Sequence, residues 1–278
     1  MKHLAVVMTV YNRKEKTLAC LAALFHQEKL GEEFDISVYL TDDGSMDGTA
    51  GAVRERYPEV NILTGSGDLY WNKGMHLAFG EALKGDHDFY LWMNDDTNLF
   101  QHALTSLLEI STKFQHKAII AGSIKDPDTN QWSYGGVIKK EKIRPLKFTP
   151  VMPSNSPKPI DTMNGNCVLI PNAVAKILGN LDPAFTHGMG DRDYGLRARK
   201  HGINIYLAPG YYGYCKRNPT IEYSKSIKDY FKTKLSKKQL PFKEYAKFAK
   251  RHAGPFWPIY TISPYIREII NLTFKRRN

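Results

Sequence analysis

Short apolar runs alternate with amphipathic stretches along the first hundred residues of the chain. Residues 4–10 form a continuous apolar run that stops at Tyr11, as is typical of a central strand covered on both faces. Apolar residues then recur at helical spacing from residue 14 to about 27, and a second strand is predicted over 36–40. This strand–helix–strand order favours parallel neighbouring strands.

The same rhythm continues to residue 93. The pattern predicts a helix over 49–57, a strand over 60–63, a helix over about 72–83 and an aromatic-rich strand over 89–93. We therefore expect an α/β fold with a mostly parallel sheet flanked by helices. In such folds the ligand binds at the carboxyl ends of the strands.

Beyond residue 100 the pattern is less regular. Residues 145–159 contain five prolines and are predicted to form an exposed loop. The other predicted elements are strands over 118–124, 132–138 and 163–170 and helices over 172–178 and 192–201, the last closed by Gly202.

Charge divides the chain more clearly than composition does. The 278 residues are 42% hydrophobic and 24% charged, with a net charge of +11, which is typical of a folded globular protein and excludes wholesale disorder. Residues 1–100 are acidic, whereas residues 216–278 carry 16 Lys and Arg against 4 Asp and Glu. We expect a catalytic domain over 1–215, with halves 1–100 and 101–215, and a basic, helical, aromatic extension over 216–278.

Two interpretations of the extension stay open. A helix over 241–252 would place Phe242, Tyr245, Ala249 and His252 on one face and its lysines on the other. This segment either rests on an anionic membrane surface or packs its aromatic face on the catalytic domain, with the lysines in water.

Cysteine usage and the N-terminus indicate a cytoplasmic protein, free or at the inner face of the cell membrane. Cys20, Cys167 and Cys215 lie far apart and lack the spacing of a zinc clip. The apolar run near the N-terminus is too short for a signal peptide or a membrane span.

Two acidic turns are predicted at strand ends. Asn94, Asp95 and Asp96 follow the strand over 89–93, and two adjacent carboxylates there suit Mg²⁺ or Mn²⁺ beside a diphosphate. The alternative is a plain turn, with Thr97 capping a helix over 98–109. Asp42 and Asp43 follow the strand over 36–40, where a carboxylate could accept the imide N–H of a nucleotide base, or the turn could simply precede a helix capped by Asp47 or Thr49.

Two further segments offer groups for a ligand. Residues 65–74 are glycine-rich and lead into a helix with Lys73, so their backbone N–H groups could receive an anion. Asp191 and Asp193 stand where a later helix begins, either as ordinary first-turn residues or as a general base, with His187 as a competing base.

Taken together, these motifs resemble the family 2 glycosyltransferases. The resemblance covers about residues 3–215 and is nearest to rhamnosyltransferase-like enzymes of bacterial surface-polysaccharide assembly. It rests on Thr9-Val-Tyr-Asn12, Thr41-Asp-Asp-Gly-Ser-Met-Asp-Gly-Thr49, Trp92-Met-Asn-Asp-Asp96 and Gly190-Asp-Arg-Asp-Tyr-Gly-Leu-Arg-Ala-Arg199 in this order.

The resemblance implies a GT-A fold and a metal-dependent, inverting transfer of sugar from a UDP- or dTDP-sugar to a glycan acceptor, expected to be lipid-linked. Asp96 would ligate Mn²⁺ or Mg²⁺, and Asp191 would deprotonate the acceptor. The donor would bind residues spread over both halves of the catalytic domain, namely Thr9, Tyr11, Asn12, Asp42, Asp43, Trp71, Lys73, Asp95, Asn164 and Gly165.

Two positions depart from the family pattern. Asn94 stands where many relatives carry Asp, which removes one charge beside the metal. Gly190 stands where a Glu normally precedes the base, which leaves Asp191 as the base and Asp193 as the second choice.

Two other functions are weighed against this one. A sugar-phosphate nucleotidyltransferase would share the α/β domain and paired carboxylates, but its glycine-rich N-terminal loop is missing from residues 10–14. A nucleic-acid-binding protein would explain the basic extension, yet the acidic first hundred residues would repel phosphate, so no nucleic-acid partner is expected.

Overall fold

The structure is a computed structural model, and it describes residues 1–141, 143–217 and 241–275. Its centre is an eight-stranded sheet with the order β11-β14-β6-β13-β4-β1-β2-β3. The strands of this sheet are β1 (Lys2–Val10), β2 (Phe34–Asp42), β3 (Asn61–Thr64), β4 (Phe89–Met93), β6 (Ile119–Ala121), β11 (Lys158–Pro159), β13 (Cys167–Pro171) and β14 (Ile205–Leu207).

Most neighbours in this sheet are parallel. The pairs β1–β2, β1–β4, β2–β3 and β14–β6 run parallel, whereas β13 is antiparallel to both β4 and β6, and β11 is antiparallel to β14. The predicted α/β fold with a mostly parallel sheet is therefore confirmed.

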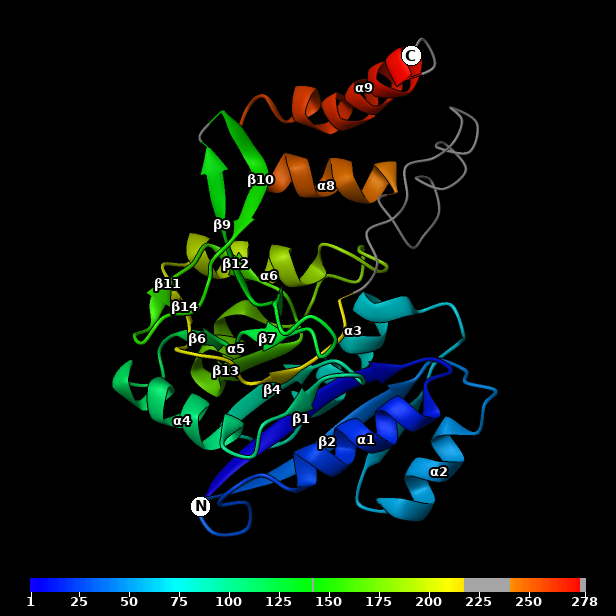
Figure 1. Ribbon diagram of the computed structural model, residues 1–278, viewed down its shortest axis with the longest axis vertical. Coiled ribbons are helices and arrows are strands. Elements are labelled where there is room, and N and C mark those ends of the chain that lie inside the picture. Colours follow the sequence, from blue (N-terminus) through cyan, green and yellow to red (C-terminus); the bar gives the residue numbers. More distant parts are fainter. Residues whose placement is uncertain (142, 218–240, 276–278) are drawn as a thin grey trace.

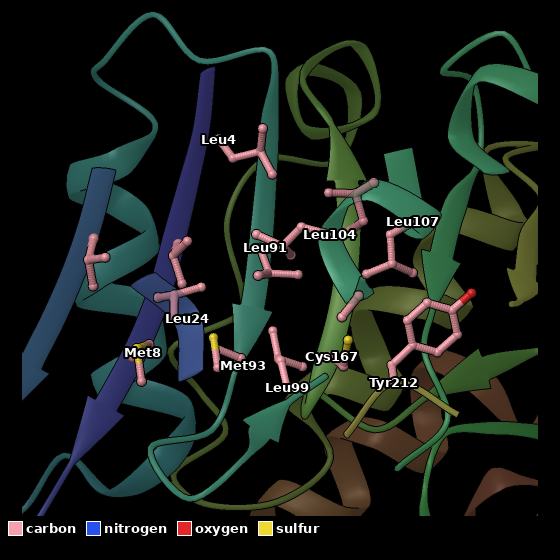
Figure 2. Packing of buried hydrophobic residues seen from close by; sticks show 14 of the residues in the cluster. Leu4, Met8, Leu24, Leu91, Met93, Leu99, Leu104, Leu107, Cys167 and Tyr212 are labelled. Carbon is pink, nitrogen blue, oxygen red and sulfur yellow. The ribbon is translucent and has the colours of Figure 1, made fainter. Parts of the chain in front are cut away.

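Helices cover both faces of the sheet (Figure 1). Alternate residues of β1 explain why: Leu4, Val6 and Met8 are buried in one hydrophobic cluster, whereas Ala5 and Val7 belong to another on the opposite face. Figure 2 shows part of the first cluster, in which Leu24, Leu104 and Leu107 meet the sheet. The helices are α1 (Lys14–Phe25), α2 (Thr49–Arg56), α3 (Tyr70–Ala82), α4 (Ala103–Lys113), α5 (Asn172–Leu178) and α6 (Gly190–Lys200).

Two small sheets extend the central one. The first has the order β5-β15-β7-β8 and the second β10-β9-β12. Their strands are β5 (Asn98–Leu99), β7 (Ile124–Lys125), β8 (Trp132–Tyr134), β9 (Gly136–Glu141), β10 (Arg144–Pro150), β12 (Thr162–Met163) and β15 (Gly213–Tyr214).

The proline-rich segment is only partly a loop, so that prediction was wrong for residues 145–150 and 158–159. Pro145 and Pro150 lie on β10, an edge strand of its sheet, and Pro159 lies on β11, the edge strand of the central sheet. An edge strand has one side without ladder hydrogen bonds, so it can accept residues that lack an N–H.

All three strands predicted beyond residue 100 are divided. The run over 132–138 forms β8 and the start of β9, which belong to different sheets, with Gly135 between them. The run over 118–124 divides at Gly122, where a Cβ would lie 2.8 Å from Sγ of Cys167, and continues in a different sheet. The run over 163–170 divides at residues 164–166, between β12 in a small sheet and β13 in the central sheet. Thr97 caps no helix, because residues 98–99 form β5 and the next helix, α4, begins at Ala103. Gly202 does close α6, in the left-handed conformation that suits glycine (φ 73°).

Two helices of the basic extension lie at the end of the molecule opposite the N-terminus (Figure 1). They are α8 (Phe242–His252) and α9 (Trp257–Lys275). Residues 218–240 of the predicted extension lie outside the described residues, and the division of the chain at residue 215 stays a prediction. None of the helices in the described ranges combines the length and apolar character that a bilayer span requires.

Candidate active site

The predicted acidic turns meet at one cavity at the carboxyl ends of β1 and β4. The cavity has a volume of about 300 Å³. Its walls include the predicted site residues Thr9, Tyr11, Asp43, Trp71, Asp95 and Asp96. His187, named above as a competing base, also lines the cavity, together with Val10, Arg13, Tyr70, Asn94 and Tyr134. Residues more than a hundred positions apart in the sequence thus form one site.

Asp95 and Asp96 share one cationic partner. Nη1 of Arg13 lies 3.2 Å from Oδ1 of Asp95 and 2.8 Å from Oδ2 of Asp96. Both carboxylates are largely buried, with 7% and 12% of the side chains exposed. Burial raises the pKa of Asp95 to about 7, although the Arg13 charge opposes this rise.

The donor set of this carboxylate pair fits a divalent cation. Oδ2 of Asp95 is buried and has no hydrogen-bond partner within the described ranges, and carboxylate oxygens are the ligands that Mg²⁺ and Mn²⁺ prefer. No group of three or more His, Cys, Asp or Glu side chains within the described residues is arranged to hold a metal ion. A cation here would therefore depend on oxygens of a substrate as well as on the protein, as Mg²⁺ commonly does with phosphates.

Asp43 holds the glycine-rich loop that precedes α3. Its Oδ1 accepts a hydrogen bond from the N–H of Gly67 at 2.8 Å, and its Oδ2 accepts two, from Leu69 and Tyr70, each at 2.9 Å. The N–H groups of these three residues are thus engaged by a carboxylate of the protein, which corrects the expectation that they are free to receive an anion. Asp43 still lines the cavity, so its contact with the donor remains a prediction.

The turns after β1 and β2 are tied to each other by side chains. Oδ1 of Asn12 accepts a hydrogen bond from the N–H of Met46 at 2.7 Å, and Oδ1 of Asp42 accepts one from Ser45 at 2.8 Å. Asp47 accepts hydrogen bonds from the N–H and hydroxyl of Thr49, the first residue of α2. Gly48 occupies the N-cap position of this helix, so the predicted cap at Asp47 or Thr49 was wrong. Asn12 and Asp42 therefore shape the rim and are not among the residues that line the cavity.

Trp71 links the carboxylate pair to Asp191. Its Nε1 donates a hydrogen bond to Oδ1 of Asn94 at 2.8 Å. On its other side lies Gly165, where a Cβ would approach the Trp71 ring to 2.4 Å and Cβ of Asp191 to 3.7 Å. Only a glycine fits between the indole and Asp191, and this contact brings the third acidic segment to the site.

Asp191 is half-buried in the first turn of α6. Its Oδ1 accepts a hydrogen bond from the N–H of Arg192 at 2.7 Å, and its Oδ2 accepts one from Gly165 at 3.2 Å. Burial raises the pKa of Asp191, although the charge of Arg192 and both hydrogen bonds oppose the rise. A raised pKa makes the ionised carboxylate a stronger proton acceptor.

The structure gives a steric reason for glycine at position 190, where the family pattern has Glu. A Cβ at Gly190 would lie 1.5 Å from Oδ1 of Asn72. The Asn72 side chain is buried and donates hydrogen bonds to the carbonyl oxygens of Asp182 and Phe185, at 2.9 and 2.6 Å. Asn72 therefore occupies the space that a side chain at position 190 would need.

Asp193 serves the fold and lies away from the cavity. It is fully buried and accepts hydrogen bonds from Nε of Arg197 at 3.0 Å and Nη1 of Arg251 at 2.6 Å, while Nε2 of His252 lies 2.8 Å away. Burial pushes the pKa of Asp193 up, but His252, Arg251 and Arg197 outweigh it and hold the pKa below its usual value. The structure thus does not support Asp193 as a second choice of base.

Helix α8 clamps the segment that leads to Asp191. Glu244 accepts hydrogen bonds from the N–H and the hydroxyl of Thr186, at 2.9 and 2.7 Å. Lys247 and Arg251 pair with Asp182 at 2.9 and 2.7 Å. The described part of the extension therefore packs on the catalytic domain, while Lys243, Lys247 and Lys250 remain exposed, as that interpretation predicted. Phe248, which the sequence pattern missed, is buried there, whereas Phe242 is 45% exposed.

We expect Arg251→Ala to lower the free energy of unfolding by about 2 kcal/mol, because it leaves the buried carboxylate of Asp193 with less compensation. Urea unfolding followed by circular dichroism measures the change. Lys243→Ala, at an exposed position of the same helix, is the control and should unfold like the wild type. Equal stability of all three proteins would show that the contacts of Arg251 contribute nothing to the free energy of unfolding.

The remaining predicted residues are not among those that line the cavity. Asn164 exchanges hydrogen bonds with the backbone of Gly135, next to Tyr134. Lys73 is half-buried on α3. Arg13, Tyr70 and Tyr134 line the cavity but were not predicted. Of these three, Arg13 could have been found from the Tyr-Asn-Arg sequence after β1, because it places a basic residue at a strand end.

An α/β sheet with acidic turns around one cavity at its strand ends is the arrangement that the resemblance to GT-A glycosyltransferases implied. The chain belongs to glycosyl transferase family 2, whose family model matches residues 5–170. The glycosyltransferase class and the GT-A fold predicted from the sequence are confirmed.

Similarities to individual proteins agree with this assignment. An N-acetylglucosaminyl-diphospho-decaprenol L-rhamnosyltransferase of Mycobacterium tuberculosis is 24% identical over 234 residues, which cover 73% of each chain. Among solved structures, S. aureus TarS matches 90% of this chain with a TM-score of 0.56 and 15% identity, and the match spans 42% of the TarS chain. TarS residues 1–349 in complex with UDP give the same TM-score and identity, over 90% of this chain and 70% of that one.

A mannosyltransferase from Pyrobaculum calidifontis, solved with GDP-Man and Mn²⁺, is similar to 94% of this chain. Its TM-score is 0.56 and its identity 15%, and the match spans 69% of that chain. At this identity the structural matches show the fold alone.

Proposed function

We propose that this glycosyltransferase moves a sugar from a UDP- or dTDP-sugar to a lipid-linked glycan by metal-dependent, inverting displacement. The observation that carries the proposal is the meeting of Asp95, Asp96 and Trp71 at one cavity, with Asp191 bonded to Gly165, which packs on the Trp71 ring. Donor, cation and acceptor base are needed at one place for this reaction, and these side chains provide them.

The donor's nucleotide would lie on the β1 and β2 side of the cavity. Thr9, Tyr11 and Asp43 line this side, and a carboxylate there suits the imide N–H of uracil or thymine. The UDP complex of S. aureus TarS, a protein of similar fold, supports a uridine nucleotide as the first donor to test.

Asp96, supported by Asp95, would hold Mn²⁺ or Mg²⁺. A bound divalent cation offsets the negative charge that grows on a departing nucleotide diphosphate. The Mn²⁺ in the mannosyltransferase of similar fold supports this assignment. Arg13 contributes a permanent positive charge beside both carboxylates and holds them in place before a donor arrives.

Asp191 would act as the general base. Its two hydrogen bonds to backbone N–H groups fix the carboxylate, and one of its oxygens takes the proton of the acceptor hydroxyl as that oxygen attacks the sugar. Gly190 supplies no second carboxylate next to it. A single base and one direct displacement give inversion at the anomeric carbon, without a covalent enzyme intermediate.

The acceptor is proposed to be a lipid-linked glycan of bacterial surface-polysaccharide synthesis. The support is the M. tuberculosis relative, whose name describes rhamnosyl transfer to N-acetylglucosaminyl-diphospho-decaprenol. An isoprenoid diphosphate of this kind resides in the membrane, so the enzyme would act at the cytoplasmic face.

We expect nucleotide diphosphate release from a UDP- or dTDP-sugar in the presence of acceptor and Mn²⁺ or Mg²⁺, and its loss on treatment with EDTA. The reason is that removal of the cation leaves the diphosphate facing two carboxylates whose negative charge Arg13 offsets only in part. A coupled nucleotide-diphosphate assay over a panel of donors measures this, and restored activity on adding back Mn²⁺ is the control. Full activity in EDTA would rule out the metal-dependent mechanism.

A further inference from the structure

The outer side of α9 exposes a row of isoleucines. Ile259, Ile262, Ile266 and Ile270 are 62%, 47%, 51% and 47% exposed. Their spacing of three and four residues places them on one face of the helix, about 17 Å long. We call these four residues the isoleucine face.

The described residues leave the isoleucine face exposed. Helix α9 packs on α8 through its opposite side, where Thr261 and Tyr265 are buried and Tyr265 approaches the rings of Phe242 and Tyr245 at 5.7 and 6.5 Å. A row of large apolar side chains left in water on an otherwise well-packed helix indicates a binding surface.

The apolar surface continues onto the neighbouring hairpin. Ile143, at the turn between β9 and β10, is 80% exposed, and its carbonyl oxygen accepts a hydrogen bond from the hydroxyl of Tyr260 at 2.8 Å. Phe256, just before α9, is 64% exposed. Figure 1 shows the hairpin reaching to α9 at the end of the molecule.

Basic residues surround this apolar surface. Lys139, Lys140 and Arg144 are exposed on the hairpin, and Arg267 is exposed on α9 next to the isoleucine face. Glu141 is the acidic residue of the hairpin and lies 3.8 Å from Arg144, whereas Glu244 of α8 is engaged by Thr186. Apolar side chains flanked by long cationic ones match the boundary of a bilayer that contains anionic lipids.

We propose that the isoleucine face and Ile143 dock this enzyme on the surface of an anionic lipid bilayer. The isoleucines enter the boundary between headgroups and acyl chains, and the flanking Lys and Arg side chains contact lipid phosphates. The inference rests on the proposed function in one respect, that a lipid-linked acceptor places the substrate at the same surface. The contact is peripheral, since α9 lies along the surface.

Sedimentation with vesicles tests the proposal. Vesicles of phosphatidylcholine with about one third phosphatidylglycerol should bind the wild type, and vesicles of phosphatidylcholine alone should bind it much less. Ile262→Gln together with Ile266→Gln should weaken binding by about 10-fold or more, because both side chains lose apolar contact with lipid. High salt should weaken wild-type binding as well.

Ile177→Gln is the matched control. Ile177 is 59% exposed on α5, away from α9, and its replacement should leave vesicle binding unchanged. Thermal unfolding checks that all variants are folded, and transfer to a short water-soluble acceptor should be equal in all of them. That assay separates the two proposals. Loss of membrane binding alone leaves transfer to the soluble acceptor unchanged. If the proposed function is wrong, no variant transfers sugar to this acceptor.

Two outcomes would overturn the docking surface. One is vesicle binding by the double variant that equals that of the wild type. The other is a wild-type dimer in analytical ultracentrifugation that the double variant converts to a monomer, which would assign the isoleucine face to a second copy of the chain.

Discussion

Replacing Asp191 by asparagine is expected to lower the rate of sugar transfer by about 100-fold or more, since general-base catalysis contributes on this scale. The substituted amide keeps the size of the side chain but cannot take the acceptor proton at neutral pH. Donor binding should be nearly unchanged, because Asp191 is not among the residues that line the cavity. Steady-state kinetics and calorimetric titration with UDP or dTDP measure the two quantities.

Asp128→Asn is a matched control for this change. Asp128 is exposed and pairs with Lys216 at 2.5 Å, and an exposed ion pair of this kind contributes little to stability. The control variant should transfer sugar at the wild-type rate. If Asp191→Asn loses donor affinity in the same proportion as activity, or transfers sugar normally, Asp191 is a structural residue of α6 and the base lies elsewhere.

Replacing Asp96 by alanine should reduce transfer by a similar factor of about 100 or more, and should also weaken donor binding that depends on Mn²⁺. The variant loses one of only two carboxylates at the cation position and leaves Arg13 paired with Asp95 alone. Donor titrations with and without Mn²⁺ should therefore differ in the wild type and agree in Asp96→Ala.

The opposite pattern would contradict the assignment of Asp96. A variant that keeps the full Mn²⁺ effect on donor binding would place the cation at other groups. Because Asp96 also accepts a hydrogen bond from the thiol of Cys215 at 3.2 Å, Asp96→Asn serves as a second variant that retains an oxygen there. Both variants should show the same loss of metal dependence.

In the basic extension, the sequence pattern predicts the helix, whereas its packing partners depend on tertiary contacts. Its sequence pattern identified a helix over 241–252 and its lysine-rich face. It could not show that Lys247 and Arg251 pair with Asp182, because their partner lies far away in the sequence. Of the two interpretations left open, α8 fits packing on the catalytic domain, whereas α9 carries the surface proposed to meet a membrane.

Local sequence is enough to predict the strand and helix rhythm and the chemistry of the strand ends. Burial on both faces produces the apolar run of β1, and parallel strands end at a common edge, so the acidic turns after β2 and β4 could be placed together from the order of the elements alone. Irregular parts were less predictable, because edge strands such as β10 depend on a partner strand more than on their own residues.

Tertiary contacts, in turn, determine which acidic residues serve the site and which serve the fold. Asp191 and Asp193 stand two residues apart in the same helical turn, yet one faces Gly165 and Trp71 and the other is enclosed by Arg197, Arg251 and His252. Successive positions of a helix point in different directions, and what each side chain meets depends on segments distant in the chain. The role of a carboxylate is set by those neighbours, which no local pattern contains.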